Sequence, residues 1–138
     1  MKKLFETHKS IVSQDQLDHM GHMNVRWYTA KFDEATWIFF AHLGITPEYI
    51  KNNDRGMAAV EQTIKYKKEA LLGDILIIKS ELIEVTKKKI RLTHHMLNFN
   101  QDLTLSTTDV TAIHIDRTLR KSCEFPSELY QNIQKFLP

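Results

Sequence analysis

The longest periodic pattern of the chain lies in residues 25–43, where apolar residues recur at steps of three and four. The stripe consists of Val25, Tyr28, Phe32, Ala35, Phe39 and Leu43. Such steps keep side chains on one face of an α-helix. Asn24 suits the N-cap position and Gly44 the left-handed residue that follows a helix. The pattern therefore predicts one long helix over residues 25–43.

The second half of this helix is apolar beyond the stripe. Trp37, Ile38 and Phe40 join Phe39 there, whereas charged residues such as Lys31 fall off the stripe nearer the start. A helix that is apolar nearly all round is normally buried. We therefore expect the second half of the helix to be covered on most sides.

Five other segments have the alternation or the β-branched composition of strands. The predicted strands are residues 4–12, 60–67, 75–85, 90–99 and 103–115. Residues 52–56 are typical of a loop, and Pro47 opens a short helical turn that ends at Ile50. Leu129, Ile133 and Leu137 indicate a short amphipathic tail after Pro126.

The order of these elements predicts the architecture. One strand and the long helix are followed by four strands, and the connections between those strands are too short for parallel crossovers. A sheet of long strands must cover one face, and the long helix is the available cover. We expect a single α+β domain over residues 1–138, a curved antiparallel β-sheet wrapped around one central α-helix.

Composition narrows the possible partners. The 138 residues carry 19 basic and 17 acidic side chains, a net charge of +2 that predicts no nucleic-acid partner. The single Cys123 leaves no intramolecular disulfide, which suits a cytoplasmic protein. No targeting segment or membrane span is expected. Two lysine clusters, at residues 65–68 and 87–89, are either solvated strand and turn residues or a phosphate-binding patch.

No spacing of His, Cys, Asp and Glu predicts a metal site, and the four glycines form no phosphate-binding loop, so we expect no cofactor. His94 and His95 are adjacent and should point to opposite faces of a strand. Glu61 is more typical of a solvated surface residue than of a second catalytic carboxylate. The candidate chemistry lies instead in the polar loop before the long helix.

That loop contains the motif Asp18-x-x-Gly21-His22-x-Asn24-x-x-x-Tyr28. Together with the order of elements, and with a later strand that ends in Ala70-x-x-Gly73-Asp74, it resembles the hotdog-fold acyl-CoA thioesterases of the 4-hydroxybenzoyl-CoA thioesterase type. The resemblance covers nearly the whole chain. It implies a hotdog fold and hydrolysis of an aliphatic or aromatic acyl-CoA to the free acid and CoA.

The resemblance also implies roles for individual residues. Asp18 takes the position of the general base or nucleophile, and the backbone near Val25 that of the donor to the thioester carbonyl. His22 and Asn24 are similar to a catalytic His and Asn of the plant acyl-carrier-protein thioesterases. The remaining substrate-binding candidates are Gly21, Tyr28 and Lys67. The family implies a homodimer, or a homotetramer made as a dimer of dimers.

Elementary chemistry is consistent with this assignment. Thioester hydrolysis needs an activated water or nucleophile and a donor aimed at the developing oxyanion, and the first amides of a helix are such donors. Other interpretations remain open: Asp18 and His22 could serve only the loop backbone, and Asn24 could be only a cap. Other functions are a non-catalytic protein that binds acyl-CoA or acyl-carrier protein, a hotdog hydratase, or a scaffold.

Overall fold

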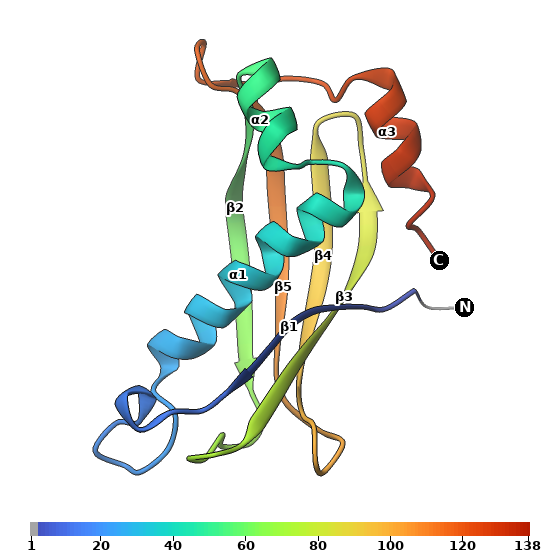
Figure 1. The fold of residues 1–138 in the computed structure, drawn as a ribbon. Coiled ribbons are helices and arrows are strands. Elements are labelled where there is room, and N and C mark those ends of the chain that lie inside the picture. The colour runs from blue at the N-terminus through green and yellow to red at the C-terminus, as the bar shows by residue number, and fades with distance from the viewer. Residues whose placement is uncertain (1–2) are drawn as a thin grey trace.

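One antiparallel sheet curves around the long helix α1, and two short helices lie at one end (Figure 1). This computed structural model describes residues 3–138. Its elements are β1 (Phe5–Ile11), the 3₁₀ turn Gln14–Gln16, α1 (Val25–Leu43), α2 (Pro47–Asn53), β2 (Arg55–Tyr66), β3 (Ile75–Val85), β4 (Lys89–Asn98), β5 (Leu103–Asp116), β6 (Lys121–Ser122) and α3 (Ser127–Gln134). The strand order is β1-β3-β4-β5-β2, with β6 beside β5, and every pairing is antiparallel. The predicted hotdog fold is confirmed.

Helix α1 begins and ends at the predicted residues. The Asn24 side chain accepts a hydrogen bond from the Arg26 amide, and Gly44 adopts the left-handed conformation with φ of 105°. The expectation that the second half is buried on most sides is wrong, because Trp37 and Ile38 are 44% and 42% exposed. A single sheet covers one side of a helix and leaves the other side to solvent or to a partner.

The predicted loop at residues 52–56 is also wrong. Its first two residues complete α2, and Arg55 already begins β2, five residues before the predicted strand. Asp54 alone turns the chain, in the left-handed conformation with φ of 52°. The Thr46 hydroxyl caps α2 and Pro47 opens it, and the helix runs past Ile50 to end where the Asp54 amide donates to the Ile50 carbonyl. The two-residue strand β6 is too short for any periodic pattern to predict.

The interior contains two hydrophobic clusters. The site-end cluster packs the first half of α1 against β3, β4 and β5, with Tyr28, Phe32, Ile78 and Met96 among its members. The far-end cluster joins the second half of α1 to the same strands and to α2 and α3. Its residues include Phe39, Phe40, Leu43, Leu82, Leu92, Val110 and Ile133.

A row of buried polar side chains lies across the sheet between these clusters. Thr7, Ser80, His94 and Thr108 occupy neighbouring strands, and Thr36 of α1 lies above them. Thr36 donates to the Phe32 carbonyl, so its hydroxyl must accept from His94 Nε2, 2.8 Å away. His94 Nδ1 then accepts from the Ser80 hydroxyl. The ring then carries one proton, on Nε2, so His94 is neutral, whereas the Thr108 hydroxyl has no hydrogen-bond partner in residues 3–138.

Strand β2 forms one edge of the sheet and pairs only with β5. It runs for twelve residues, and its apolar Val60 and Tyr66 are 57% and 50% exposed. An unpaired strand of this length is a template for pairing with another chain. None of the helices in residues 3–138 is long and apolar enough to cross a membrane.

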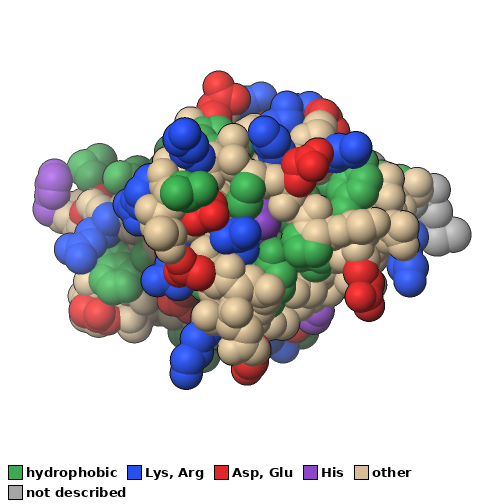
Figure 2. Space-filling model, turned by 90° about the horizontal axis from the view of Figure 1, so that it is seen from above, with side chains coloured by type: hydrophobic (Ala, Val, Ile, Leu, Met, Phe, Trp, Pro, Cys, Tyr) green, Lys and Arg blue, Asp and Glu red, His purple; other side chains and the backbone are tan. Residues whose placement is uncertain are grey.

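The end of the molecule that carries α2 and α3 has charges of both signs. Seen from above, Lys and Arg side chains lie there among Asp and Glu side chains rather than in one continuous basic patch (Figure 2). Lys87 and Lys88 are exposed in the β3–β4 turn, and Lys89 begins β4. The structure therefore favours the solvated reading of this cluster.

Candidate active site

The loop before α1 is folded by its own backbone. The Asp18 amide donates to the His22 carbonyl and the Gly21 amide donates to the Asp18 carbonyl, each at 3.0 Å. Gly21 has φ of 84°, a conformation that favours glycine. Asp18 Oδ1 accepts from the Met20 amide at 2.8 Å. These bonds form a compact turn that fixes both Asp18 and His22.

A second segment, residues 70–74, holds this loop in place. The Met23 amide donates to the Ala70 carbonyl at 2.8 Å, and the Gly73 amide donates to the Val12 carbonyl at 2.9 Å. Asp74 Oδ2 accepts from the Leu71 amide at 2.9 Å. The motif Ala70-x-x-Gly73-Asp74 is thus explained by structure, because it ties the end of β2 to the mouth of α1.

A pocket of about 240 Å³ opens between residues 22–28 and residues 66–69. Its lining comes from the start of α1 and from the end of β2, and consists of His22, Met23, Val25, Tyr28, Tyr66, Lys67, Lys68 and Glu69. The Tyr28 and Tyr66 rings meet edge to face, with centroids 5.1 Å apart. The Tyr28 hydroxyl accepts from the Ala70 amide at 3.2 Å, and burial raises the pKa of Tyr28. Tyr28 is therefore a fixed wall of the pocket.

His22 and Asp18 lie next to each other at the pocket. His22 Nδ1 is 3.9 Å from Asp18 Oδ2 and 3.4 Å from the Met23 carbonyl oxygen. Both contacts use Nδ1, so Nε2 has no partner in residues 3–138. His22 lines the pocket and Asp18 does not. Of these two side chains, the histidine is therefore the one beside a molecule in the pocket.

The first turn of α1 leaves one amide beside the pocket. The Arg26 amide donates to Asn24 Oδ1 at 3.0 Å, and the Trp27 amide donates to the Asn24 carbonyl at 2.9 Å. The Val25 amide takes part in neither bond, and Val25 lines the pocket. An amide at a helix N-terminus carries the positive end of the helix dipole. It is a ready donor to an oxygen that gains negative charge.

The predicted site residues therefore fall into two groups. His22, Val25, Tyr28 and Lys67 line the pocket. The other three support it: Asp18 lies behind His22, Gly21 makes the turn, and Asn24 caps the helix. The sequence assignment missed Tyr66 and Glu69 as lining residues. Both could have been found, because they lie in the stretch that carries the second family motif.

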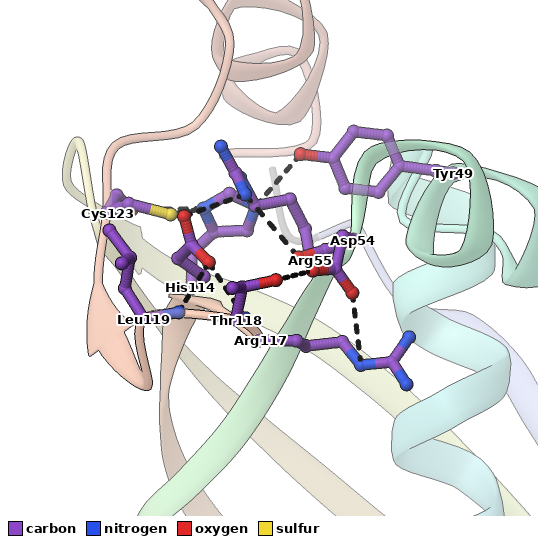
Figure 3. A network of polar contacts seen from close by, with 9 residues as sticks. Tyr49, Asp54, Arg55, His114, Arg117, Thr118, Leu119 and Cys123 are labelled. Carbon is purple, nitrogen blue, oxygen red and sulfur yellow. Dashed lines mark hydrogen bonds and ion pairs between the residues drawn. The ribbon is translucent and has the colours of Figure 1, made fainter.

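Another polar network lies at the opposite end of β2 (Figure 3). His114 Nδ1 is 3.0 Å from the Cys123 carbonyl oxygen and 3.4 Å from its sulfur, and His114 Nε2 is 2.8 Å from the Tyr49 hydroxyl. A carbonyl only accepts, so Nδ1 carries the proton and cannot take one from the Cys123 thiol. Burial lowers the pKa of His114. This network anchors the loop that carries Arg117.

The other candidates from the sequence offer no rival site. His94 is buried and His95 lies on the opposite sheet face, as predicted. Glu61 is exposed on β2, and Cys123 is half-buried. In the described part of the chain, no three His, Cys, Asp or Glu side chains are placed to hold a metal ion.

The fold and the pocket together define a class, a hotdog protein with an apolar pocket at the mouth of its central helix. The family model of the thioesterase-like superfamily matches residues 12–133. The chain belongs to this superfamily.

Solved structures resemble the whole chain. A Staphylococcus aureus protein crystallised with CoA aligns with a TM-score of 0.88 at 23% identity, covering 100% of this chain and 88% of its own. A 1,4-dihydroxy-2-naphthoyl-CoA thioesterase from Synechocystis gives 0.81 at 15% identity, covering 96% of each chain. A gentisyl-CoA thioesterase gives 0.79 at 21% identity, covering 92% of this chain and 98% of its own. At these identities the likeness establishes the fold.

One curated relative matches part of its own length. The L-carnitine dehydrogenase/betainyl-CoA thioesterase of Agrobacterium fabrum is 25% identical over 122 residues, which are 88% of this chain. The chain spans only about a quarter of that relative, 25% of its length.

Proposed function

We propose that this protein hydrolyses an acyl-CoA thioester to the free acid and CoA. The observation that carries the proposal is the pocket at the mouth of α1, which His22 and Val25 both line, with Asp18 Oδ2 3.9 Å from His22 Nδ1. Membership of the thioesterase-like superfamily and the CoA-bound structural relative support it.

The reaction assigns a task to each group. A water in the pocket gives a proton to His22 Nε2 and attacks the thioester carbonyl carbon. The Val25 amide donates to the carbonyl oxygen as its negative charge develops. The tetrahedral intermediate then expels the CoA sulfur, which takes the proton from His22. Asp18 stabilises the imidazolium that exists between these two steps.

This arrangement revises the order of the two side chains. The sequence analysis made Asp18 the group that acts on water or on the thioester. In the folded chain its Oδ1 is held by the Met20 amide and His22 stands nearer the pocket. We therefore propose that Asp18 and His22 act as one unit, in which Asp18 positions the histidine.

The pocket favours a small acyl group. Its volume of about 240 Å³ and its walls of Met23, Tyr28 and Tyr66 suit an aromatic ring or a short chain. Two structural relatives are named for aromatic acyl-CoA substrates, and the curated relative for the quaternary ammonium acyl group of betainyl-CoA. We keep both classes as candidates, because aromatic faces also attract quaternary ammonium groups.

A homodimer would complete the site. We propose that two copies pair through the free edges of β2, as the family resemblance implies. In a symmetric antiparallel pair, the Arg55 end of one strand lies beside the Tyr66 end of the other. Arg117 and Arg120, which follow β5 at the Arg55 end, would then reach the partner's pocket. With Lys67 and Lys68 they would attract the CoA phosphates.

The test is a thiol-release assay over a panel of acyl-CoAs. The panel contains short, medium and long chains, aromatic acyl groups and betainyl-CoA. We expect saturable release with a small aromatic, short-chain or betainyl substrate and a lower rate with long chains. If no thioester is hydrolysed while CoA thioesters raise the melting temperature, the protein is a non-catalytic acyl-binding protein and the proposal is wrong.

A further inference from the structure

A second group of polar side chains lies between β1 and α1, at the edge of the sheet opposite β2. His8 and Ser10 belong to β1, and Lys31 and Glu34 belong to α1. Ser10 Oγ is 3.0 Å from His8 Nε2 and 2.7 Å from Lys31 Nζ. His8 Nδ1 is 3.7 Å from Glu34 Oε2. None of these four side chains lines the pocket at the mouth of α1.

The donors in this group can be assigned one after another. An ammonium only donates, so the Ser10 oxygen accepts from Lys31 and the Ser10 proton is left for another acceptor. Burial lowers the pKa of His8, an effect that Glu34 partly opposes, so the ring is neutral near neutral pH. The Ser10 hydroxyl therefore donates to His8 Nε2. His8 Nδ1 then carries the ring proton and faces Glu34.

This order of groups is that of an activated serine. Serine hydrolases form an acyl-enzyme with a hydroxyl that donates to a neutral imidazole, whose other nitrogen faces a carboxylate. Lys31 adds a positive charge beside the Ser10 oxygen, which favours that oxygen as it loses its proton. The same ammonium has further N–H bonds, which can donate to an oxygen on the carbon that Ser10 attacks.

The burial of the four side chains differs in a way that suits this chemistry. Lys31 is 4% exposed and the His8 side chain 8% exposed, whereas Ser10 is partly exposed at the free edge of β1. The base and the ammonium are thus shielded from water, where electrostatic effects are stronger. A purely structural tie between β1 and α1 would not require the hydroxyl to remain open to solvent.

We propose that Ser10 is the nucleophile of a second hydrolytic site, which acts on small carboxylic esters. The Ser10 oxygen attacks the ester carbonyl carbon as its proton passes to His8 Nε2, and the Lys31 ammonium donates to the carbonyl oxygen. The bond between this carbon and the alcohol oxygen breaks, and the alcohol takes the proton from His8. Water then gives a proton to His8 and attacks the acyl-serine. The free acid leaves, and the Ser10 oxygen takes the proton back.

This second site does not rest on acyl-CoA hydrolysis. It shares no residue with the pocket at the mouth of α1. Because β1 and β2 are opposite edges of the sheet, pairing of two copies through β2 would leave Ser10 uncovered. Failure of either assignment therefore leaves the other standing.

Labelling with a fluorophosphonate tests the nucleophile directly. The probe forms a phosphorus–oxygen bond with an activated serine and loses fluoride, and peptide mass spectrometry locates the label. Ser13 is the internal control, because it is exposed nearby and its hydroxyl donates to Asp15 Oδ1 rather than to an imidazole. In the folded parent, Ser10 should be labelled roughly tenfold or more faster than Ser13. An unlabelled Ser10, or equal rates at the two serines, would overturn the proposal.

Variants separate an activated hydroxyl from one that is merely accessible. His8→Gln keeps a hydrogen-bonding side chain beside Ser10 but cannot take up its proton, so labelling should slow by roughly a hundredfold or more. Should this variant fail to fold by circular dichroism, Glu34→Gln replaces it, because the Glu34 side chain is 67% exposed. Its labelling should slow several-fold. Unchanged labelling in whichever folded variant is used would contradict the proposal.

Hydrolysis of 4-nitrophenyl acetate then tests turnover. Ser10→Ala removes the nucleophile, and Ser13→Ala is the matched control in the same segment. We expect Ser10→Ala to release 4-nitrophenol roughly tenfold more slowly than Ser13→Ala, which should match the parent. Equal rates in the two folded variants would show that the serine on β1 does not hydrolyse esters, and the proposal would be wrong.

Discussion

The two hydrophobic clusters of the core share α1 and the sheet, but they are closed differently. At the far end, α2 and α3 add Tyr49, Leu129 and Ile133 to the far-end cluster. At the site end residues 3–138 form no further α-helix, and the first turn of α1 and the end of β2 leave a pocket. The site-end cluster is shut only by two loops that hydrogen-bond to each other. The same helix thus supports a packed end and an open end.

The far-end cluster therefore contributes mainly to stability, and the site-end cluster leaves room for chemistry. A fully covered cluster contributes burial energy and leaves no room for a ligand. An open cluster gives up some burial and gains a surface on which backbone amides and polar side chains converge. The polar row through His94 marks the boundary between them. Substitutions on either side of that row should therefore have different consequences.

Phenylalanines on the two sides provide the strongest contrast. Phe39 and Phe32 are both fully buried, Phe39 in the far-end cluster and Phe32 one turn beyond Tyr28 in the site-end cluster. Each change to alanine should cost about 3–5 kcal/mol of unfolding free energy. Urea unfolding measures this loss, and assays on the folded fraction measure kcat. We expect kcat to fall only in Phe32→Ala, and an equal fall in Phe39→Ala would erase the contrast.

The polar row around His94 should make the free energy of unfolding depend on pH. Burial, with a smaller effect of neighbouring His95, lowers the pKa of His94 to about 3. The unfolded chain, with an ordinary histidine pKa near 6.5, then binds the proton more readily. Stability from neutral His94 is complete above about pH 6.5 and is lost as the pH falls toward 3. At pH 5 this loss is about 2 kcal/mol.

Urea midpoints at pH 7.5 and pH 5 measure the effect. His94→Gln removes the titrating group, so the difference between the two pH values should shrink. The lowered pKa of His114 contributes in the same direction and leaves a residual difference. If His94→Gln keeps the whole of the parent's pH dependence, the account of the polar row is wrong.

Replacing the helix cap at each end of the molecule makes the same comparison with a smaller expected loss of stability. Asn24 caps α1 at the pocket, and Thr46 caps α2 at the far end by accepting from the Tyr49 amide. Replacement by alanine should cost about 1 kcal/mol at either site. Only Asn24→Ala moves the amides that face the thioester, so only this variant should also lower kcat. Thermal melts and thiol release on both variants make the comparison, and parallel losses of rate would refute it.

The smallest expected effect is that of added salt on the KM for acyl-CoA. Lys67 and Lys68 line the pocket, and their attraction to the CoA phosphates is screened by added salt. Between low and high salt, the KM for an acyl-CoA should rise several-fold more than the KM for the matching acyl-pantetheine. Equal changes would mean that these lysines do not bind the phosphates.

Much of this fold could be predicted because its signals are local. The α1 stripe, the Asn24 cap and the Gly44 stop lie within one segment, and the long antiparallel strands follow from alternation and short turns. The loop predicted at residues 52–56 was wrong because a run of loop-forming residues does not reveal that a single residue, Asp54, makes the turn. The predicted burial of Trp37 and Ile38 was wrong because helix periodicity does not reveal how many sides of a helix other elements cover.

The site could be predicted only in part for a related reason. The motif from Asp18 to Tyr28 is local, so the mouth of α1 was found. The opposite wall comes from Tyr66 and Glu69, some forty residues later, and it is held there by tertiary hydrogen bonds of Ala70 with Met23 and Tyr28. The placement of Asp18 behind His22 depends on one turn at Gly21 and on hydrogen bonds that no spacing encodes.

The most direct measurement of the central claim is thiol release by Asp18→Asn, His22→Ala and their double variant on the best thioester. If the two side chains act as one unit, each single change should lower kcat by roughly 10²–10⁴, and the double variant should be about as slow as the slower single variant. Asp109→Asn removes a charge on the outer face, and its amide oxygen can still accept from the Thr93 hydroxyl, so this variant should match the parent. A folded Asp18→Asn or His22→Ala protein as fast as the parent would contradict the account.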